Sequence, residues 1–489
     1  MWEEDKFIFR LIPDPNHYLA WLSLGLLFFF LSEKSGIFDR VKMRLNVTLV
    51  SSLFVSFLFS LYFDAIGFLL ALSLAVAFFS SLQSSIAAVC TTVILYICRP
   101  WEVVETNDWW MQLPRWCIWL WFVSWLRERI NHKIESFAYL KMTPGIWLIG
   151  TMAVWAFLTS FLSRDSAGSI QYYIDTLMRA IILVLIIQLT VRCEEDAKKI
   201  QTAFAVGVAT LSIFSLWRFQ GFDQHAPLDI VPRMLNQSDR RLEAVGSLGN
   251  SNDIAAVVLI PLGILWPKLF AKTSQLHIRI FSLIIIYFLI KAILASQSRG
   301  ALIAGVAQCG IYFLSQSRSP ARFGTLLLIA VSLVAPLANQ VMGRNADDLD
   351  ASTESRMNYY VTGLRMALYS PIWGQGFGRY PYEFERYSSA TLHEWGHRTA
   401  HSSWVLVVSE TGFVGLAIFT LIHARMFRQC WQLRNIEPGL LLALSGYSIT
   451  ILFLSHSWLM FPWILFVLIE LRRKFTTAGV SDEKTILQS

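Results

Sequence analysis

The chain has 489 residues, of which 55% are hydrophobic and 15% are charged, and its mean hydropathy is +0.49. Soluble domains are about a quarter charged, so this composition excludes a soluble globular protein, a disordered chain and a coiled coil, and it predicts a polytopic membrane protein. The net charge of +7 is expected to reflect cytoplasmic loops rather than nucleic-acid binding. The six cysteines form no CxxC pair, which argues against a disulfide framework or a zinc ribbon.

Apolar stretches that could cross a bilayer as helices recur along the chain. They lie at 18–31, 45–62, 65–80, 82–98, 109–126, 143–163, 170–190, 200–218, 253–270, 278–295, 300–316, 323–341 and 401–424. A last apolar run, 439–471, predicts two short spans joined by a turn near His456–Ser457. We therefore expect an all-α, polytopic bundle of membrane helices with about 12 to 15 spans, because about 20 apolar residues cross a bilayer.

Basic residues gather in six of the loops between these spans. These loops are 127–142, 191–199, 268–279, 318–322, 425–434 and 472–474. Alternating the spans places all six loops on one side, which we expect to be the cytoplasm. The two long polar loops, 219–252 and 341–400, then share the outer side.

This topology predicts five regions along the chain. They are N-terminal membrane helices (1–218), an outer loop (219–252), central membrane helices (253–340), a large outer loop (341–400), and C-terminal membrane helices with a cytoplasmic tail (401–489). The larger loop has 60 residues, which is marginal for an independent core. We therefore expect it to pack on the bundle as an ordered cap over a cavity.

Every basic residue in the two outer loops is an arginine. The nine are Arg233, Arg240, Arg241, Arg344, Arg356, Arg365, Arg379, Arg386 and Arg398. A guanidinium group suits phosphate recognition, because its planar fork makes paired hydrogen bonds and keeps its charge. The alternative is a rim of ion pairs with the acidic residues of the same loops. Arg299, at the head of span 300–316, could equally be a phosphate ligand or a snorkelling anchor.

The segment His393-Glu394-Trp395-Gly396-His397 matches the HExxH pattern of zinc proteases. In that pattern two histidines one helical turn apart bind the metal, and the glutamate activates water. Gly396 disfavours the helix that the pattern needs, and the segment is polar. We therefore expect no metal site and no other cofactor, and keep a zinc protease as an alternative function.

Four segments of the second half resemble, in the same order, segments of the O-antigen ligase and polymerase superfamily. They are Arg240–Asn252, with Arg240-Arg241, Gly246 and the turn Asn250-Ser251-Asn252; Ser298-Arg299-Gly300-Ala301; Arg356 followed by the run Pro371–Gly378 and Tyr380; and Ala400-His401-Ser402 followed by Glu410–Gly415. The chain departs from the family at Ser251, where proline is commoner, and at Ser402, where asparagine is usual. The N-terminal half is similar to the family only as generic membrane helices.

The resemblance implies a metal-independent, GT-C-like membrane glycosyltransferase of the bacterial inner membrane, with its active site facing the periplasm. Its donor would be a glycan on undecaprenyl diphosphate, and its acceptor a lipid-linked saccharide, as in O-antigen or exopolysaccharide polymerases, or lipid A core, as in the ligases of lipopolysaccharide assembly. The family's diphosphate-binding arginines correspond to Arg241, with Arg240 beside it, and to Arg299 and Arg356. Its loop histidine corresponds to His401, and its buried acid to Glu410.

The chemistry of such a transfer suits these residue types. A departing diphosphate needs fixed positive charge in a water-poor cavity, which guanidinium groups supply. An acceptor hydroxyl needs a base that titrates near neutral pH, and an imidazole fits. Two further functions stay open: a transporter of lipid-linked saccharide, which would need inverted repeats or broken helices, and a protein O-oligosaccharyltransferase.

Several charged or titratable residues could have structural roles. His401 could belong to a helix cap, because Ser402 or Ser403 can serve as the N-cap of the following helix. Glu410 could pair with a core arginine. Asp175 and Arg179 are expected to form an ion pair within span 170–190, whereas Lys291 has no evident partner in the sequence.

Overall fold

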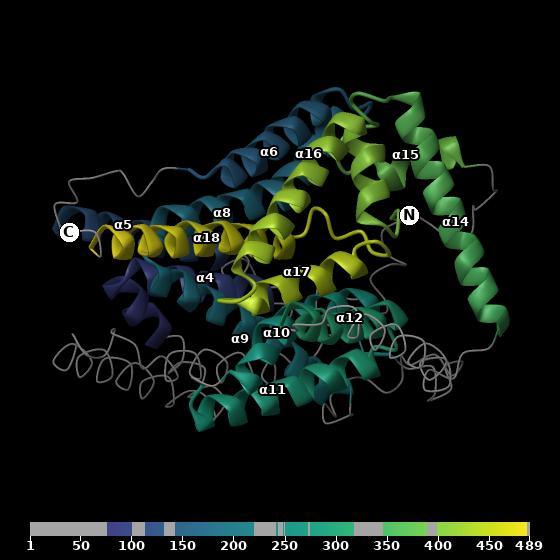
Figure 1. The fold of residues 1–489 in the computed structure, drawn as a ribbon. Coiled ribbons are helices and arrows are strands. Elements are labelled where there is room, and N and C mark those ends of the chain that lie inside the picture. Colours follow the sequence, from purple (N-terminus) through teal and green to yellow (C-terminus); the bar gives the residue numbers. More distant parts are fainter. Residues whose placement is uncertain are drawn as a thin grey trace, which may run out of the picture. The chain divides into compact units, whose positions relative to one another are not determined.

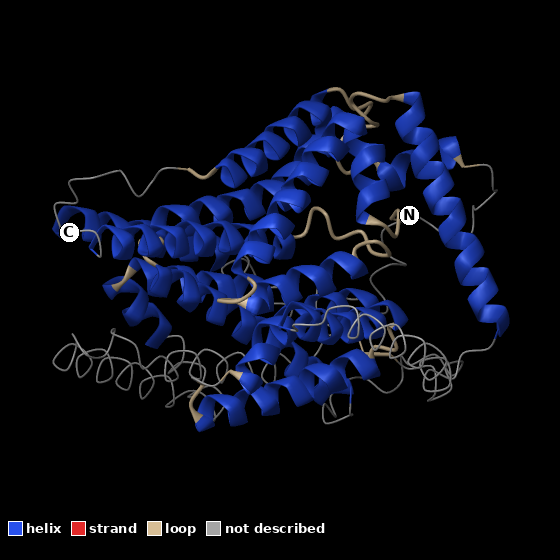
Figure 2. Ribbon diagram, in the orientation of Figure 1, coloured by secondary structure: helices blue, strands red, loops and turns tan. Residues whose placement is uncertain are grey.

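The computed structural model of the chain describes residues 76–99, 113–131, 142–219, 241–242, 248, 250–271, 274–316, 346–388 and 399–486. In these residues the elements are helices joined by turns and loops, without a strand (Figure 2). The all-α prediction is therefore confirmed. The spans predicted at 18–31, 45–62 and 323–341, and most of 65–80, lie outside the described residues.

Most of the described helices overlap the predicted apolar segments, and α14 and α15 do not. The first set comprises α4 (Ser85–Cys98), α5 (Leu113–Asn131), α6 (Pro144–Phe161), α7 (Ser166–Tyr173), the π-helix η4 (Ile174–Met178), α8 (Arg179–Thr190) and α9 (Glu194–Phe219). The second comprises α10 (Ser251–Phe270), α11 (Leu276–Ala295), α12 (Arg299–Gln316), α14 (Ala346–Tyr369), α15 (Tyr380–Tyr387), α16 (Ser403–Leu433), α17 (Pro438–Thr450) and α18 (Met460–Ile486) (Figure 1).

Six described helical segments are long and apolar enough to cross a membrane, which supports a multi-pass membrane protein. They are Pro144–Phe161, Ser166–Thr190, Glu194–Trp217, Ser251–Phe270, Ile278–Ala295 and Ser403–Leu433. Two observations refine the predicted loops. The segment 341–400, predicted as an outer loop, contains α14 and α15. The turn expected near His456–Ser457 lies in the connection between α17 and α18.

The chain forms two compact units, and each is described by itself. Unit 1 comprises residues 1–137, 195–261 and 280–297, and unit 2 comprises 138–194, 262–279 and 298–489. In unit 1, α4 is buried along its whole length. Its first residue, Ser85, donates from the backbone N–H and from Oγ to the carboxylate of Glu128 on α5, at 2.7 and 2.8 Å.

Two buried arrangements of charged and polar side chains join helices in unit 2. Arg472, 1% exposed, donates to Glu194 at 2.9 Å and to Glu437 at 2.7 Å. Glu470 on α18 accepts from Arg425 Nε and from Gln429 Nε2 on α16, both at 2.6 Å. Two arginines of the loops predicted to be cytoplasmic therefore lie in helices and form contacts between them. Arg425 lies within α16 and Arg472 within α18.

Three charged residues inside predicted spans each have a partner on the same helical segment. Asp175 and Arg179 form the expected i,i+4 ion pair, and Asp175 lies within η4. Lys291 has a partner that the sequence did not suggest: its Nζ lies 5.8 Å from the ring centroid of Tyr287, one turn earlier on α11. Such a cation–π contact partly offsets the cost of a charge on an apolar helix.

Helix α16 is broken at Gly412, where φ is 70° and ψ is −176°. The break frees backbone groups that a membrane cannot hydrate. Residues 371–376, which we call the strap, satisfy several of them: Gln375 N donates to Ser409 O at 2.8 Å, Gly376 N to Glu410 O at 3.0 Å, and Phe413 N to Pro371 O at 2.7 Å. The indole of Trp155 on α6 donates to Thr411 O at 2.8 Å. These four hydrogen bonds pair backbone groups that the break in α16 leaves free.

Candidate active site

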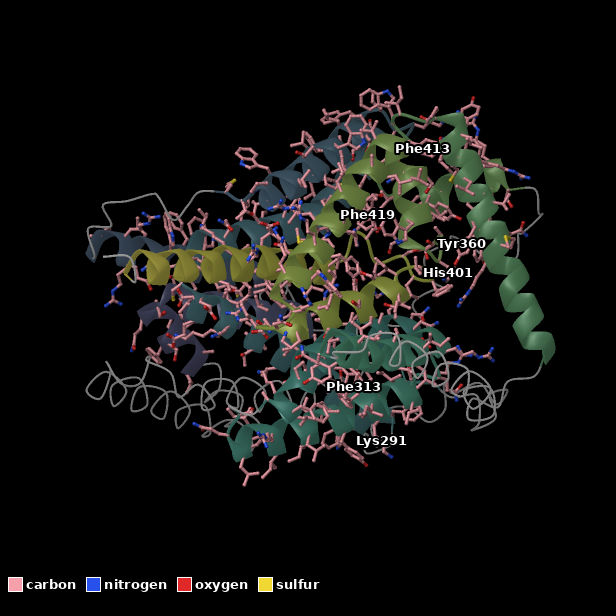
Figure 3. The ribbon with its side chains drawn as sticks, in the orientation of Figure 1. Lys291, Phe313, Tyr360, His401, Phe413 and Phe419 are labelled. Carbon is pink, nitrogen blue, oxygen red and sulfur yellow. The ribbon has the colours of Figure 1, made fainter. Side chains whose placement is uncertain are left out.

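His401 lies in the turn that leads into α16, and its backbone is left-handed, with φ of 49°. Few non-glycine residues adopt this region, and they deserve a structural explanation. Tyr360 on α14 lies beside His401 (Figure 3), and its hydroxyl donates to His401 O at 3.2 Å. The His401 and Tyr359 ring centroids lie 5.2 Å apart. Ser402 is the N-cap of α16, with Oγ accepting from Val405 N. The cap is therefore Ser402, and the His401 imidazole is not used for it.

The connection between α17 and α18, residues 451–459, packs against this turn. Ser403 N donates to Ile451 O at 2.9 Å, and Ser403 Oγ donates to Leu454 O at 2.7 Å. The same Oγ accepts from His456 N at 2.9 Å. The Tyr360 hydroxyl also reaches Leu452 O, at 3.4 Å. These contacts fix the position of His401 from both α14 and the connection.

Arg299 is the first residue of α12 and borders the same connection. A Cβ on the next residue, Gly300, would lie 3.8 Å from the ring of Phe453. Two guanidinium atoms of Arg299, Nε and Nη2, are buried and find no hydrogen-bond partner within the described part of unit 2. Buried donors without a partner are costly, and the start of a helix favours an anion. This arrangement is suited to binding a negatively charged oxygen.

Arg356 lies one helical turn before Tyr360 on α14. Burial raises the pKa of the Tyr360 phenol, and the positive charge of Arg356 partly opposes that shift. The structure therefore brings Arg356 near the His401 turn through Tyr360.

Arg241 belongs to unit 1, where Leu242 N donates to Ala295 O at 2.9 Å, and its part in the site stays a prediction. Arg240 lies outside the described residues.

Glu410 is buried, with 1% exposure, just before the break in α16. Its Oε1 accepts from Tyr380 N at 3.1 Å, and its Oε2 accepts from the indole of Trp458 at 2.7 Å. The carboxyl group thereby joins α15, α16 and the 451–459 connection. These contacts hold the carboxylate in place, and its catalytic role stays a prediction.

Arg379 is a structurally important residue that the sequence did not single out from the other outer-loop arginines. It is 6% exposed, its Nη1 lies 2.5 Å from Asp165 Oδ2, and its guanidinium covers the ring of Tyr382 at 4.6 Å. The sequence suggested ion pairs within the loops, but this partner lies 214 residues away. The pair ties α15 to the N-cap of α7.

Replacing Trp458 with phenylalanine tests the Glu410 contact. The change leaves a fully buried carboxyl oxygen without its donor, which we expect to lower the apparent free energy of unfolding by about 1–3 kcal/mol. Trp463→Phe is the matched control, because the Trp463 indole donates to the backbone carbonyl of Ser457 at 3.1 Å. Unfolding in mixed detergent micelles measures both variants. An equal loss of stability in the two would contradict the role given to Glu410.

The zinc-protease alternative depends on residues outside the described part of the chain. His393, Glu394 and His397 all lie there. Within the described residues, no group of three or more histidine, cysteine, aspartate or glutamate side chains is arranged to hold a metal ion.

The comparison with protein families matches one part of the chain. Residues 254–420 match the family model described as "O-Antigen ligase". This segment is about a third of the 489 residues, and it contains Arg299, Arg356, His401 and Glu410. No curated protein matches the chain. The resemblance noted in the sequence is thereby confirmed: residues 254–420 of this chain are similar to the O-antigen ligase family.

Proposed function

We propose that the protein transfers a glycan from undecaprenyl diphosphate to a saccharide acceptor at the periplasmic face of the bacterial inner membrane. The acceptor would be a second lipid-linked repeat or the lipid A core. The observation that carries the proposal is the Arg299 guanidinium, because two of its buried donors lack partners at the start of a helix within the family's matched segment. A diphosphate oxygen supplies the acceptor atoms that this group needs.

The transfer assigns each side chain one task. The acceptor hydroxyl attacks the anomeric carbon of the donor, the bond between that carbon and the diphosphate oxygen breaks, and undecaprenyl diphosphate leaves with the bonding electrons. His401 accepts the hydroxyl proton. Arg299 and Arg356 stabilise the charge that develops on the diphosphate, and Arg241 is proposed to join them. Guanidinium groups fixed before the reaction stabilise that charge without reorganising.

His401→Asn tests this assignment without disturbing the turn. Asparagine is among the residues that best tolerate the left-handed backbone at this position, and its amide cannot act as a base near neutral pH. We expect transfer to fall by about 100-fold or more, with the melting temperature unchanged. The measurement is product formation by the purified chain in nanodiscs with a lipid-diphosphate-linked oligosaccharide and an acceptor.

His393→Asn is the matched control for that experiment. A transferase that uses His401 keeps its activity in this variant and binds no stoichiometric zinc. If His401→Asn retains full transfer while His393→Asn loses both function and bound zinc, the protease alternative replaces the transferase.

A further inference from the structure

One face of α14 exposes a row of large apolar side chains. Met357, Val361, Leu364 and Leu368 recur at intervals of three and four residues, and are exposed by 59, 36, 47 and 70%. This spacing places them on one side of a helix. The opposite side, which includes Tyr359, Thr362 and Met366, is buried within unit 2. The helix is therefore apolar on the face that unit 2 leaves uncovered.

The charge along α14 changes where this row begins. The first ten residues, 346–355, contain four acidic residues, whereas 356–373 contain none and two arginines. A helix in water carries polar residues on its free face. The composition of residues 346–355 is typical of a helix in water. The composition of residues 356–373 is typical of a helix in an apolar environment bordered by basic residues.

The row continues into the exposed apolar surface of two candidate membrane spans. Trp373 follows it in sequence, is itself exposed, and stacks on Trp155 of α6, with 4.7 Å between the ring centroids. Phe413 of α16 is bonded through its backbone N to Pro371 O, and its side chain is also exposed (Figure 3). Exposed apolar side chains on spans face lipid, so the α14 row extends a lipid-facing surface.

We propose that Met357, Val361, Leu364 and Leu368 contact the acyl chains of the bilayer, so that α14 from Arg356 to Tyr369 is a membrane-interface helix and not part of an aqueous cap. Burying apolar area contributes about 25 cal/mol per Å², and interface helices bind membranes in this way. Tyr369 and Trp373 are residues that favour the interface. Arg356 and Tyr360, on a neighbouring face, are then held at the depth of the lipid head groups. This inference does not depend on the transferase chemistry.

Nitroxide labels measure the depth directly. Cysteine is introduced at Leu364 or Leu368 in a background with Cys193→Ser and Cys309→Ser, because the other four native cysteines are buried. The labelled full chain is reconstituted in phosphatidylcholine–phosphatidylglycerol vesicles, and collision with oxygen is compared with collision with a water-soluble nickel chelate. Leu421, exposed on the span α16, is the lipid control, and Glu385, exposed on α15, is the aqueous control.

We expect labels at Leu364 and Leu368 to give an oxygen-to-nickel ratio several-fold above that at Glu385 and approaching that at Leu421. A ratio equal to that at Glu385 would place the row in water and overturn the proposal. Low accessibility to both reagents, together with spin–spin coupling between copies, would show that a second chain covers the row and would overturn it as well. Unchanged melting temperatures of the labelled variants show that each ratio reports the native fold.

Discussion

Replacing Arg299 with alanine is expected to reduce glycan transfer by about 100- to 1,000-fold, the loss typical of removing one donor that stabilises charge in a transition state. The fall should appear mainly in kcat, because the charge on the departing diphosphate is largest in the transition state. Arg299→Lys should retain more activity than Arg299→Ala, since lysine keeps the charge but cannot make the paired hydrogen bonds. Steady-state kinetics on the reconstituted chain measure both.

Arg365→Ala is the matched control for that prediction. Arg365 lies on α14, is exposed, and donates a hydrogen bond to Tyr387 O at 3.3 Å. It has no task in the proposed transfer. We expect the kcat of the Arg365→Ala variant to stay close to that of the unmodified chain. Similar losses in Arg299→Ala and Arg365→Ala would mean that general positive charge, and not the Arg299 site, supports the reaction.

Gly412→Ala is expected to have the largest effect on folding. The backbone at Gly412, with φ of 70° and ψ of −176°, is a conformation that other residues adopt only with strain. A Cβ there would lie 2.1 Å from Ile372 O, a backbone atom of the strap. Strain and overpacking together should cost about 2–6 kcal/mol, and loosen the strap from α16. The yield of monodisperse protein and its melting temperature measure the effect.

Gly150→Ala on α6 provides the comparison. A Cβ at Gly150 meets no atom within 4 Å, and alanine is favoured over glycine inside a helix by about 0.5–1 kcal/mol. This variant should therefore match or slightly exceed the unmodified chain in stability. If both glycine variants melt alike, the break in α16 is not the constrained feature described above.

Hydrophobic length alone located most of the described helices. The span predicted at 143–163 is α6, Pro144–Phe161, because its apolar run ends where polar residues begin on both sides. The span predicted at 401–424 instead continues to Leu433. Arg425, in the charged second half of this helix, is paired with Glu470 on α18. Glu470 lies 45 positions away in the sequence, so the residues around Arg425 do not indicate that the helix continues.

The candidate site was predictable where its chemistry is local and missed where it is long-range. The order of motifs pointed to Arg299 and His401, and the structure places both beside the 451–459 connection. The buried environment of Glu410 depends on Tyr380 and Trp458, and that of Arg379 depends on Asp165. Periodicity does not reveal such pairs, because each joins segments that meet only after the helices have packed. The same holds for Gly412, whose φ is set by the strap.

The proposed reaction forms a glycosidic bond with a glycan from a lipid-linked donor at the Arg299 and His401 site. Its most direct test is mass spectrometry of the products from proteoliposomes that contain the purified chain, undecaprenyl-diphosphate-linked oligosaccharide and an acceptor saccharide. We predict that the glycan becomes joined to the acceptor, that undecaprenyl diphosphate is released in equal amount, and that Arg299→Ala loses both. Glycan that crosses the membrane without a new glycosidic bond would contradict the proposal and identify a transporter.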